Sequence, residues 1–288
     1  MLTVDSLLAL TILPDGITDA WRFFILGTIA VMVFGVAKAG FGGVGAITTP
    51  MMIYACGGQE NTGMAVALLL PLLIACDWVA LLLWWRKWDW PIARSLLPGM
   101  VAGVGLGAGA LWMFKSLGDS VGAKQITGAA LSLTVGLIAL IFVAMQLRTR
   151  RPAESSAPAA PAGWQVATLG SAAGFTSTLA HAAGPLVTMF LLPQQMPKGR
   201  FVATTTLFFW IANQVKLIPY FGLGLMSMPS LATELALLPA VLAGALLGLF
   251  LHNRVNQKWF NRVLYVLLVG MGVHMSATSL YELWQRLG

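Results

Sequence analysis

Long, continuous runs of apolar residues dominate the chain, and short polar stretches separate them. Two of the clearest runs are Met64–Trp85 and Leu231–Leu251, each close to the roughly 20 residues that an α-helix needs to cross a bilayer. The strands of an outer-membrane barrel would instead alternate apolar and polar positions over about ten residues. The pattern therefore predicts an all-α, polytopic membrane protein.

A polar segment near the middle divides the apolar runs into two groups. This segment, RTRRPAESSAPAAPAG, is rich in Pro, Ala and Ser and is typical of a linker. We therefore predict an N-terminal segment, a first transmembrane repeat, a linker and a second transmembrane repeat, at residues 1–20, 21–147, 148–163 and 164–288.

The two halves contain matching segments. Residues 96–107 read LLPGMVAGVGLG and residues 237–248 read LLPAVLAGALLG, and each segment contains a Gly-x-x-x-Gly pair that allows close helix packing. Earlier in each half a Gly-Phe pair opens a break that is rich in Gly, Ser and Thr and ends in Pro: GFGGVGAITTP at 40–50 and GFTSTLAHAAGP at 174–185. Internal duplication of this kind is typical of transporters, although channels also use it.

The distribution of Lys and Arg indicates whether each break is a kink in a spanning helix or a hairpin. If each break only kinks a spanning helix, eight crossings divide the loop cations eight to seven between the two sides. If each break is a hairpin, the halves are inverted and each contains a broken-helix hairpin plus three transmembrane helices, with eight to ten membrane segments in all. The hairpin arrangement places four cations on one side and eleven on the other, namely Arg86, Lys87, Arg94, Arg148, Arg150, Arg151, Lys198, Arg200, Arg254, Lys258 and Arg262.

This imbalance favours the hairpin arrangement, because cytoplasmic loops carry an excess of Lys and Arg. We therefore predict that the linker at 148–163 is cytoplasmic and that both termini are outside. The same distribution explains the net charge of +7, which reflects membrane orientation and does not indicate a nucleic-acid partner. Only 9% of the residues are charged, and the mean hydropathy is +0.82, so the composition excludes a soluble domain.

The sequence around the two breaks resembles a known family. GFGGVGAITTPMM is similar to the first signature of the sulfite exporter TauE/SafE family, also called TSUP. The second half, at 174–220, resembles the family more closely through Gly-Phe-x-Ser-Thr, Ala-His-Ala-x-Gly-Pro and Asn-x-x-Lys-x-x-Pro-Tyr. The resemblance covers residues 25–284 and implies a secondary carrier, with an exporter as the expectation, for sulfite, organosulfonates and related small sulfur-containing anions in a bacterial-type inner membrane.

The breaks themselves supply the neutral part of the predicted substrate site. A helix that restarts after a break at membrane depth turns its N–H groups and the positive end of its dipole towards a cavity. The alternative is that the glycines serve only close packing. The candidates in the two breaks are Gly42, Gly43, Thr48, Thr49, Ser177, Thr178 and His181. For His181, a hydrogen-bond or proton-relay role is weighed against a purely structural one.

Charged residues inside apolar runs supply the rest of the site, because such residues are expensive in a bilayer. Lys38 and Lys216 are candidate anion ligands, and Asn213 could donate its amide. Asp77 is a candidate for ion coupling or an ion pair, since a carboxylate repels an anion. The alternatives are a structural Asp77–Lys216 pair, a snorkelling Lys38 and an interhelical hydrogen bond from Asn213.

Other functions were weighed against the carrier. An anion channel would also fit the duplicated breaks, and Ser177 with His181 could form the nucleophile and base of an intramembrane hydrolase. A hydrolase would not need a second break, however, and the first break contains neither Ser nor His. We therefore expect no enzyme, no cofactor and no metal site; the expected partners are the lipid bilayer, the anion and a coupling proton or ion.

Overall fold

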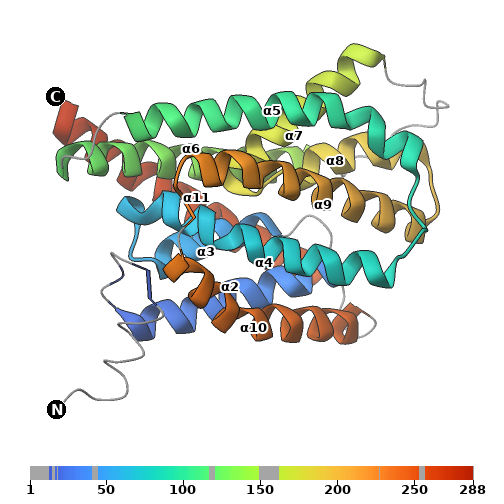
Figure 1. Ribbon diagram of the computed structural model, residues 1–288, viewed down its shortest axis with the longest axis horizontal. Coiled ribbons are helices and arrows are strands. Elements are labelled where there is room, and N and C mark those ends of the chain that lie inside the picture. The colour runs from blue at the N-terminus through green and yellow to red at the C-terminus, as the bar shows by residue number, and fades with distance from the viewer. Residues whose placement is uncertain are drawn as a thin grey trace.

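The computed structural model describes residues 13–14, 17, 19–40, 45–116, 121–148, 162–226, 228–252 and 257–287, and no strand occurs within them. In these ranges the chain forms a stack of helices (Figure 1). The helices are α2 (Ala20–Gly40), α3 (Thr48–Ala55), α4 (Thr62–Leu83), α5 (Trp90–Ser116), α6 (Val121–Arg148), α7 (Gly163–Ala180), α8 (Gly184–Leu191), α9 (Lys198–Gly222), α10 (Met228–His252) and α11 (Gln257–Leu287).

Seven of these helices, which are α2, α4, α5, α6, α9, α10 and α11, contain a segment long and apolar enough to cross a membrane. Many of their large apolar side chains point outwards; Ile218, for example, is 76% exposed and Leu246 is 69% exposed. Exposure on this scale suits lipid contact, because a soluble monomer rarely leaves large apolar patches open to water. The fold confirms the predicted all-α, multi-pass membrane protein.

The helices that follow the two breaks are short. Both α3 and α8 contain eight residues, which gives a length of about 12 Å at 1.5 Å per residue. The hydrocarbon core of a bilayer is about 30 Å thick. Each of these two helices is therefore too short to cross a membrane, a point that the sequence pattern had left open.

Each short helix returns towards the end of the stack from which the preceding helix came. Tyr54 near the end of α3 lines the same cavity as Arg22 near the start of α2. After α8, Arg200 approaches Asp89, which precedes α5, at 3.7 Å, and the N-terminal halves of α5 and α7 lie close together, as at Gly99 and Ala167. The breaks are therefore hairpins and not kinks, as the distribution of basic residues predicted.

Two pairs of closely packed helices that join the halves contain the matching glycine segments. On α5, a Cβ added at Gly103 would lie 2.0 Å from the backbone oxygen of Ser171 on α7, and on α10 one added at Gly244 would lie 2.4 Å from that of Met32 on α2. The glycines of the two matching segments therefore allow the backbones to touch. Both pairs run parallel, and each joins one helix from each half (Figure 1).

This cross-pairing is consistent with two inverted halves, although the inversion itself stays a prediction. The third close pair is formed by α6 and α11, which contact each other at Gly136 and Gly272. In Figure 1 the α2–α10 pair and the α5–α7 pair form opposite edges of the stack, and α4 and α9 run between them. The described ends of the two breaks, at Thr49 and Ala180, are buried in the interior.

Candidate functional site

The two breaks meet inside the stack. The hydroxyl of Thr49, in the first turn of α3, donates a hydrogen bond of 2.7 Å to the backbone oxygen of Ala180, the last residue of α7. Ala46 and Ala182, on either side of this contact, belong to one buried apolar cluster. Residues about 130 positions apart in the chain are thus held together at the start of one helix and the end of another.

Helix α7 ends at this junction because His181 adopts a left-handed backbone conformation, with a φ of 51°. The backbone N–H of His181 donates to the oxygen of Ser177 at 3.1 Å and caps the last turn. Non-glycine residues rarely adopt this conformation, although His is one of those enriched in it. The chain then restarts at Gly184, and Pro185 occupies the first turn of α8, where the missing N–H costs nothing.

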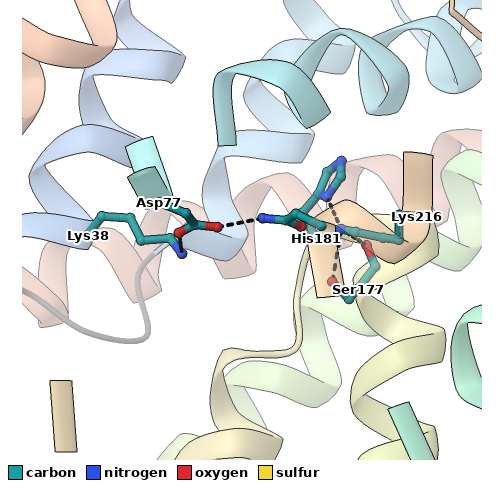
Figure 2. A network of polar contacts seen from close by, with 6 residues as sticks. Lys38, Asp77, Ser177, His181 and Lys216 are labelled. Atoms are coloured by element: carbon teal, nitrogen blue, oxygen red, sulfur yellow. Dashed lines mark hydrogen bonds and ion pairs between the residues drawn. The ribbon is translucent and has the colours of Figure 1, made fainter. Parts of the chain in front are cut away.

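The ammonium group of Lys216, on α9, lies at the end of α7 and is fully buried. It donates to the backbone oxygen of Ser177 at 3.2 Å, to the Ser177 hydroxyl at 3.0 Å and to Nδ1 of His181 at 3.0 Å (Figure 2). Nε2 of His181 lies 2.9 Å from the backbone oxygen of Val66. A carbonyl oxygen only accepts, so Nε2 carries the proton and Nδ1 accepts from Lys216.

A second polar group surrounds Asp77 on α4, whose side chain is also fully buried. One carboxylate oxygen forms an ion pair with Lys38 near the end of α2. The other accepts a hydrogen bond of 2.7 Å from the amide of Asn213 on α9. The Lys38 ammonium also lies over the ring of Phe209, 4.4 Å from its centroid, where the face of the ring attracts a cation.

Helix α9 connects the two groups. Asn213 and Lys216 are three positions apart, so they lie on one face of the helix one turn from each other. Figure 2 shows the two groups side by side, with Lys38 and Asp77 on one side and Lys216, His181 and Ser177 on the other. We call this set of six side chains, Lys38, Asp77, Ser177, His181, Asn213 and Lys216, the polar network.

Among the buried donors without a hydrogen-bond partner in the described residues, two belong to residues in or next to the polar network. The hydroxyl of Thr48 is the first, and it belongs to the first residue of α3, next to Thr49. The amide nitrogen of Gln214, between Asn213 and Lys216 on α9, is the second. Buried polar atoms normally find a partner, so each unpaired donor requires an explanation.

The comparison with known families adds to this geometry. Residues 26–275 match the family model described as sulfite exporter TauE/SafE. The chain belongs to the sulfite exporter TauE/SafE family. This agrees with the family that the two break sequences indicated. It is a family of membrane transporters that export sulfite and other anions. Searches of curated proteins and of solved structures found no significant match.

Most of the residues proposed from the sequence of this TauE/SafE protein lie at the junction. Asn213 and Lys216 reach it from α9, and Lys38 and Asp77 complete the polar network. Thr178 is buried, but its hydroxyl donates to Gly174 in its own helix at 2.8 Å. Gly42 and Gly43 lie outside the described residues. The role of each residue in binding an anion stays a proposal.

One pairing considered from the sequence is different in the structure. Asp77 forms its ion pair with Lys38 and not with Lys216, so Lys38 does not extend to the membrane surface. Its side chain is only 16% exposed. The spacing along the chain indicated that three charges lie at depth, but it carried no information about which helix faces which.

Sequence reasoning missed Tyr220 and Phe209, which complete the surroundings of the network. The fully buried hydroxyl of Tyr220 donates to the backbone oxygen of Thr178 at 2.6 Å. Tyr220 follows Lys216 by four residues, so helical spacing places both on one face, and this signal could have identified it. Nothing comparable marks Phe209 within its run of aromatic residues.

Proposed function

We propose that this TauE/SafE protein is a secondary transporter that exports small sulfur-containing anions, such as sulfite or organosulfonates. Family membership supports membrane transport of an anion. The polar network at the junction of the two breaks supports a central binding site. Transporters of this kind place their substrate where broken helices meet near the midplane.

The observation that carries the proposal is the charge count in the polar network. Two lysines share a single carboxylate, and Lys38 already pairs with it. No carboxylate of the described residues lies within salt-bridge distance of Lys216; its three contacts are with Ser177 and His181. A bound anion would supply the negative partner that the Lys216 ammonium lacks among the described residues.

Neutral donors near Lys216 would hold the oxygen atoms of the anion. The Ser177 hydroxyl accepts from Lys216, so its own proton can be donated to a ligand. The unpaired Thr48 hydroxyl begins α3, where the positive end of the helix dipole adds to the attraction. A few neutral donors with one cation bind an anion weakly enough to release it.

Asp77 and Lys38 would then serve the coupling step. A carboxylate beside the site repels the anion, so direct contact between Asp77 and the substrate is unfavourable. In our proposal Asp77 exchanges its partners as a coupling proton or ion binds, which would reposition Asn213 and with it the face of α9 that contains Lys216.

Two features favour a carrier over the alternatives. Lys216 and Asp77 are completely buried, as expected for a carrier closed around its site. A hydrolase would require the Ser177 hydroxyl to donate to His181. In the structure this hydroxyl contacts Lys216, and Nδ1 of His181 is occupied by the same ammonium group.

The proposal is tested by Lys216→Met in proteoliposomes, with labelled sulfite, thiosulfate, sulfate, taurine and sulfoacetate as the panel. Methionine retains most of the side-chain volume and removes the charge. We expect apparent affinity to fall at least about tenfold, or about 1.4 kcal/mol. Ser177→Ala should cost less, because a neutral donor contributes less than a charged one.

Lys115→Met is the matched control. Lys115 is exposed at the end of α5, and its ammonium group donates to the backbone oxygen of Leu223 outside the polar network. This variant should transport like the wild type. Unchanged affinity in well-folded Lys216→Met protein would remove Lys216 from the site. Flux that neither saturates nor accelerates with substrate on the opposite side would indicate a channel.

A further inference from the structure

A cavity with several polar lining residues lies away from the polar network. Its volume is about 230 Å³, and it opens at the end of the stack where α2 begins and α3 ends. Its polar lining is contributed by Arg22, Tyr54, Gln59, Ser132, His274 and Thr278. None of the residues of the polar network lines this cavity, so it is a separate compartment.

Arg22 contributes a cationic group to this lining. No carboxylate of the described residues lies within salt-bridge distance of its guanidinium. The nearby Asp19 instead accepts a hydrogen bond of 2.9 Å from the backbone N–H of Arg22. An arginine is charged at any physiological pH and can bind an oxyanion through two parallel hydrogen bonds.

The acidic groups at the same end already have partners. Glu282 pairs with Arg286 at 3.4 Å and, with the Gln59 amide oriented to satisfy both of its ends, accepts from Gln59 at 3.0 Å. Glu60 accepts from Gln125 at 3.0 Å. Arg286 compensates the charge of Glu282, and neither glutamate lines the cavity.

Ser132 provides an independent sign of a ligand. It lies on α6, lines the cavity and is fully buried, yet its hydroxyl has no hydrogen-bond partner among the described residues. A buried hydroxyl without a partner is costly. A ligand in the cavity could accept the hydrogen bond that Ser132 does not make.

We propose that this cavity is a second binding site for a small oxyanion, with Arg22 providing the charge and Ser132 a buried donor. Its volume is several times the roughly 30 Å³ that one water molecule occupies in the liquid. A sulfite or a short sulfonate therefore fits together with some of its water. The identity of the anion rests on the proposed function, whereas the site itself does not.

The position of the cavity suggests a waiting site on the transport path. Its apolar lining residues Ile53 and Met275 belong to the same buried cluster as Ile47 and Ala180, which flank the junction of the breaks. An anion in the cavity is thus separated from the polar network by an apolar layer. Arg86 and Arg200 lie at the opposite end of the stack, so the cavity faces the side predicted to be external.

The test measures how fast a cysteine at position 132 reacts in purified protein. Ser132→Cys is made in a Cys56→Ala/Cys76→Ala background and treated with methanethiosulfonates that carry either a sulfonate or a trimethylammonium group. Rates are normalised to a free thiol. We expect the anionic reagent to react about tenfold faster, which corresponds to about 1.4 kcal/mol, and methanesulfonate ion to protect the cysteine saturably.

Arg22→Gln should abolish both the preference and the protection. Lys115→Gln, which removes a cation outside the cavity lining that has no carboxylate partner, should retain them. Equal rates for the two reagents, no reaction with either one, or a preference that survives Arg22→Gln would overturn the proposal. If Ser132→Cys does not fold, Thr278→Cys on the same lining replaces it.

The same variants separate this inference from the proposed function. Lys216→Met should weaken transport and leave the protection at position 132 intact. If methanesulfonate fails to protect the cysteine at position 132 while the protein transports normally, only the second site is rejected. If Lys216→Met transports with normal substrate affinity and the cysteine at position 132 is still protected, only the central site is rejected.

Discussion

The ion pair between Lys38 and Asp77 makes the sharpest test of how the polar network is held together. Asp77→Asn removes the carboxylate charge while retaining the size of the side chain and an oxygen that can accept from Asn213. The Lys38 ammonium is then left without its partner in a site where only 16% of its side chain is exposed. A buried charge without a partner is strongly destabilising.

The magnitude follows from the surroundings of Lys38. Removing one partner of a buried pair costs about 3–5 kcal/mol. The ring of Phe209, 4.4 Å from the ammonium, offsets about 1 kcal/mol of this. We therefore expect Asp77→Asn to lower the free energy of unfolding by about 2–4 kcal/mol. Lys38→Met should cost more, because the fully buried carboxylate would keep only the amide of Asn213.

The double variant Lys38→Met/Asp77→Asn removes both charges and should recover most of the loss. Thermal unfolding of the four purified proteins in one detergent completes a double-mutant cycle, and its coupling energy isolates the pair. Transport driven by a pH gradient is then measured in the same four proteins. If Asp77 is the coupling residue, the double variant should be stable but insensitive to the gradient, while substrate exchange persists.

Two results would refute this reasoning. Wild-type stability in Asp77→Asn would show that the pair does not hold α2 against α4. Full response to a pH gradient in the stable double variant would show that Asp77 does not carry the coupling proton.

Two further predictions concern packing and topology. Gly103→Ala should strongly destabilise the protein in thermal unfolding, since its Cβ would lie 2.0 Å from the Ser171 oxygen; Gly105→Ala on the same helix meets nothing within 4 Å and should be neutral or slightly stabilising. Equal effects of the two changes would contradict the close α5–α7 contact. In a background without Cys56 and Cys76, Lys87→Cys and Arg200→Cys should react with an impermeant reagent from the cytoplasmic side, and Ser116→Cys from the outside. Labelling of the cysteines at 87 and 200 from opposite sides would rule out the second hairpin.

Much of the fold could be predicted from the sequence because bilayer helices depend on local composition. Continuous apolar runs identify the spanning segments, whatever their neighbours. The two Gly-rich breaks and the basic loops are also local features, so the hairpins could be inferred from the distribution of charge. The lengths of α3 and α8 could not, because their ends depend on where the chain meets other helices.

The tertiary structure decided which side chains form the candidate site. The sequence by itself identified Lys38, Asp77 and Lys216 as charges at membrane depth, because each interrupts an apolar run. It could not assign their partners, since these depend on how each helix is rotated and where helices cross. The glycine contacts of α2 with α10 and α5 with α7 set those crossings. Asp77 consequently faces Lys38, and Lys216 faces the end of α7 without a carboxylate, an arrangement that no local pattern encodes.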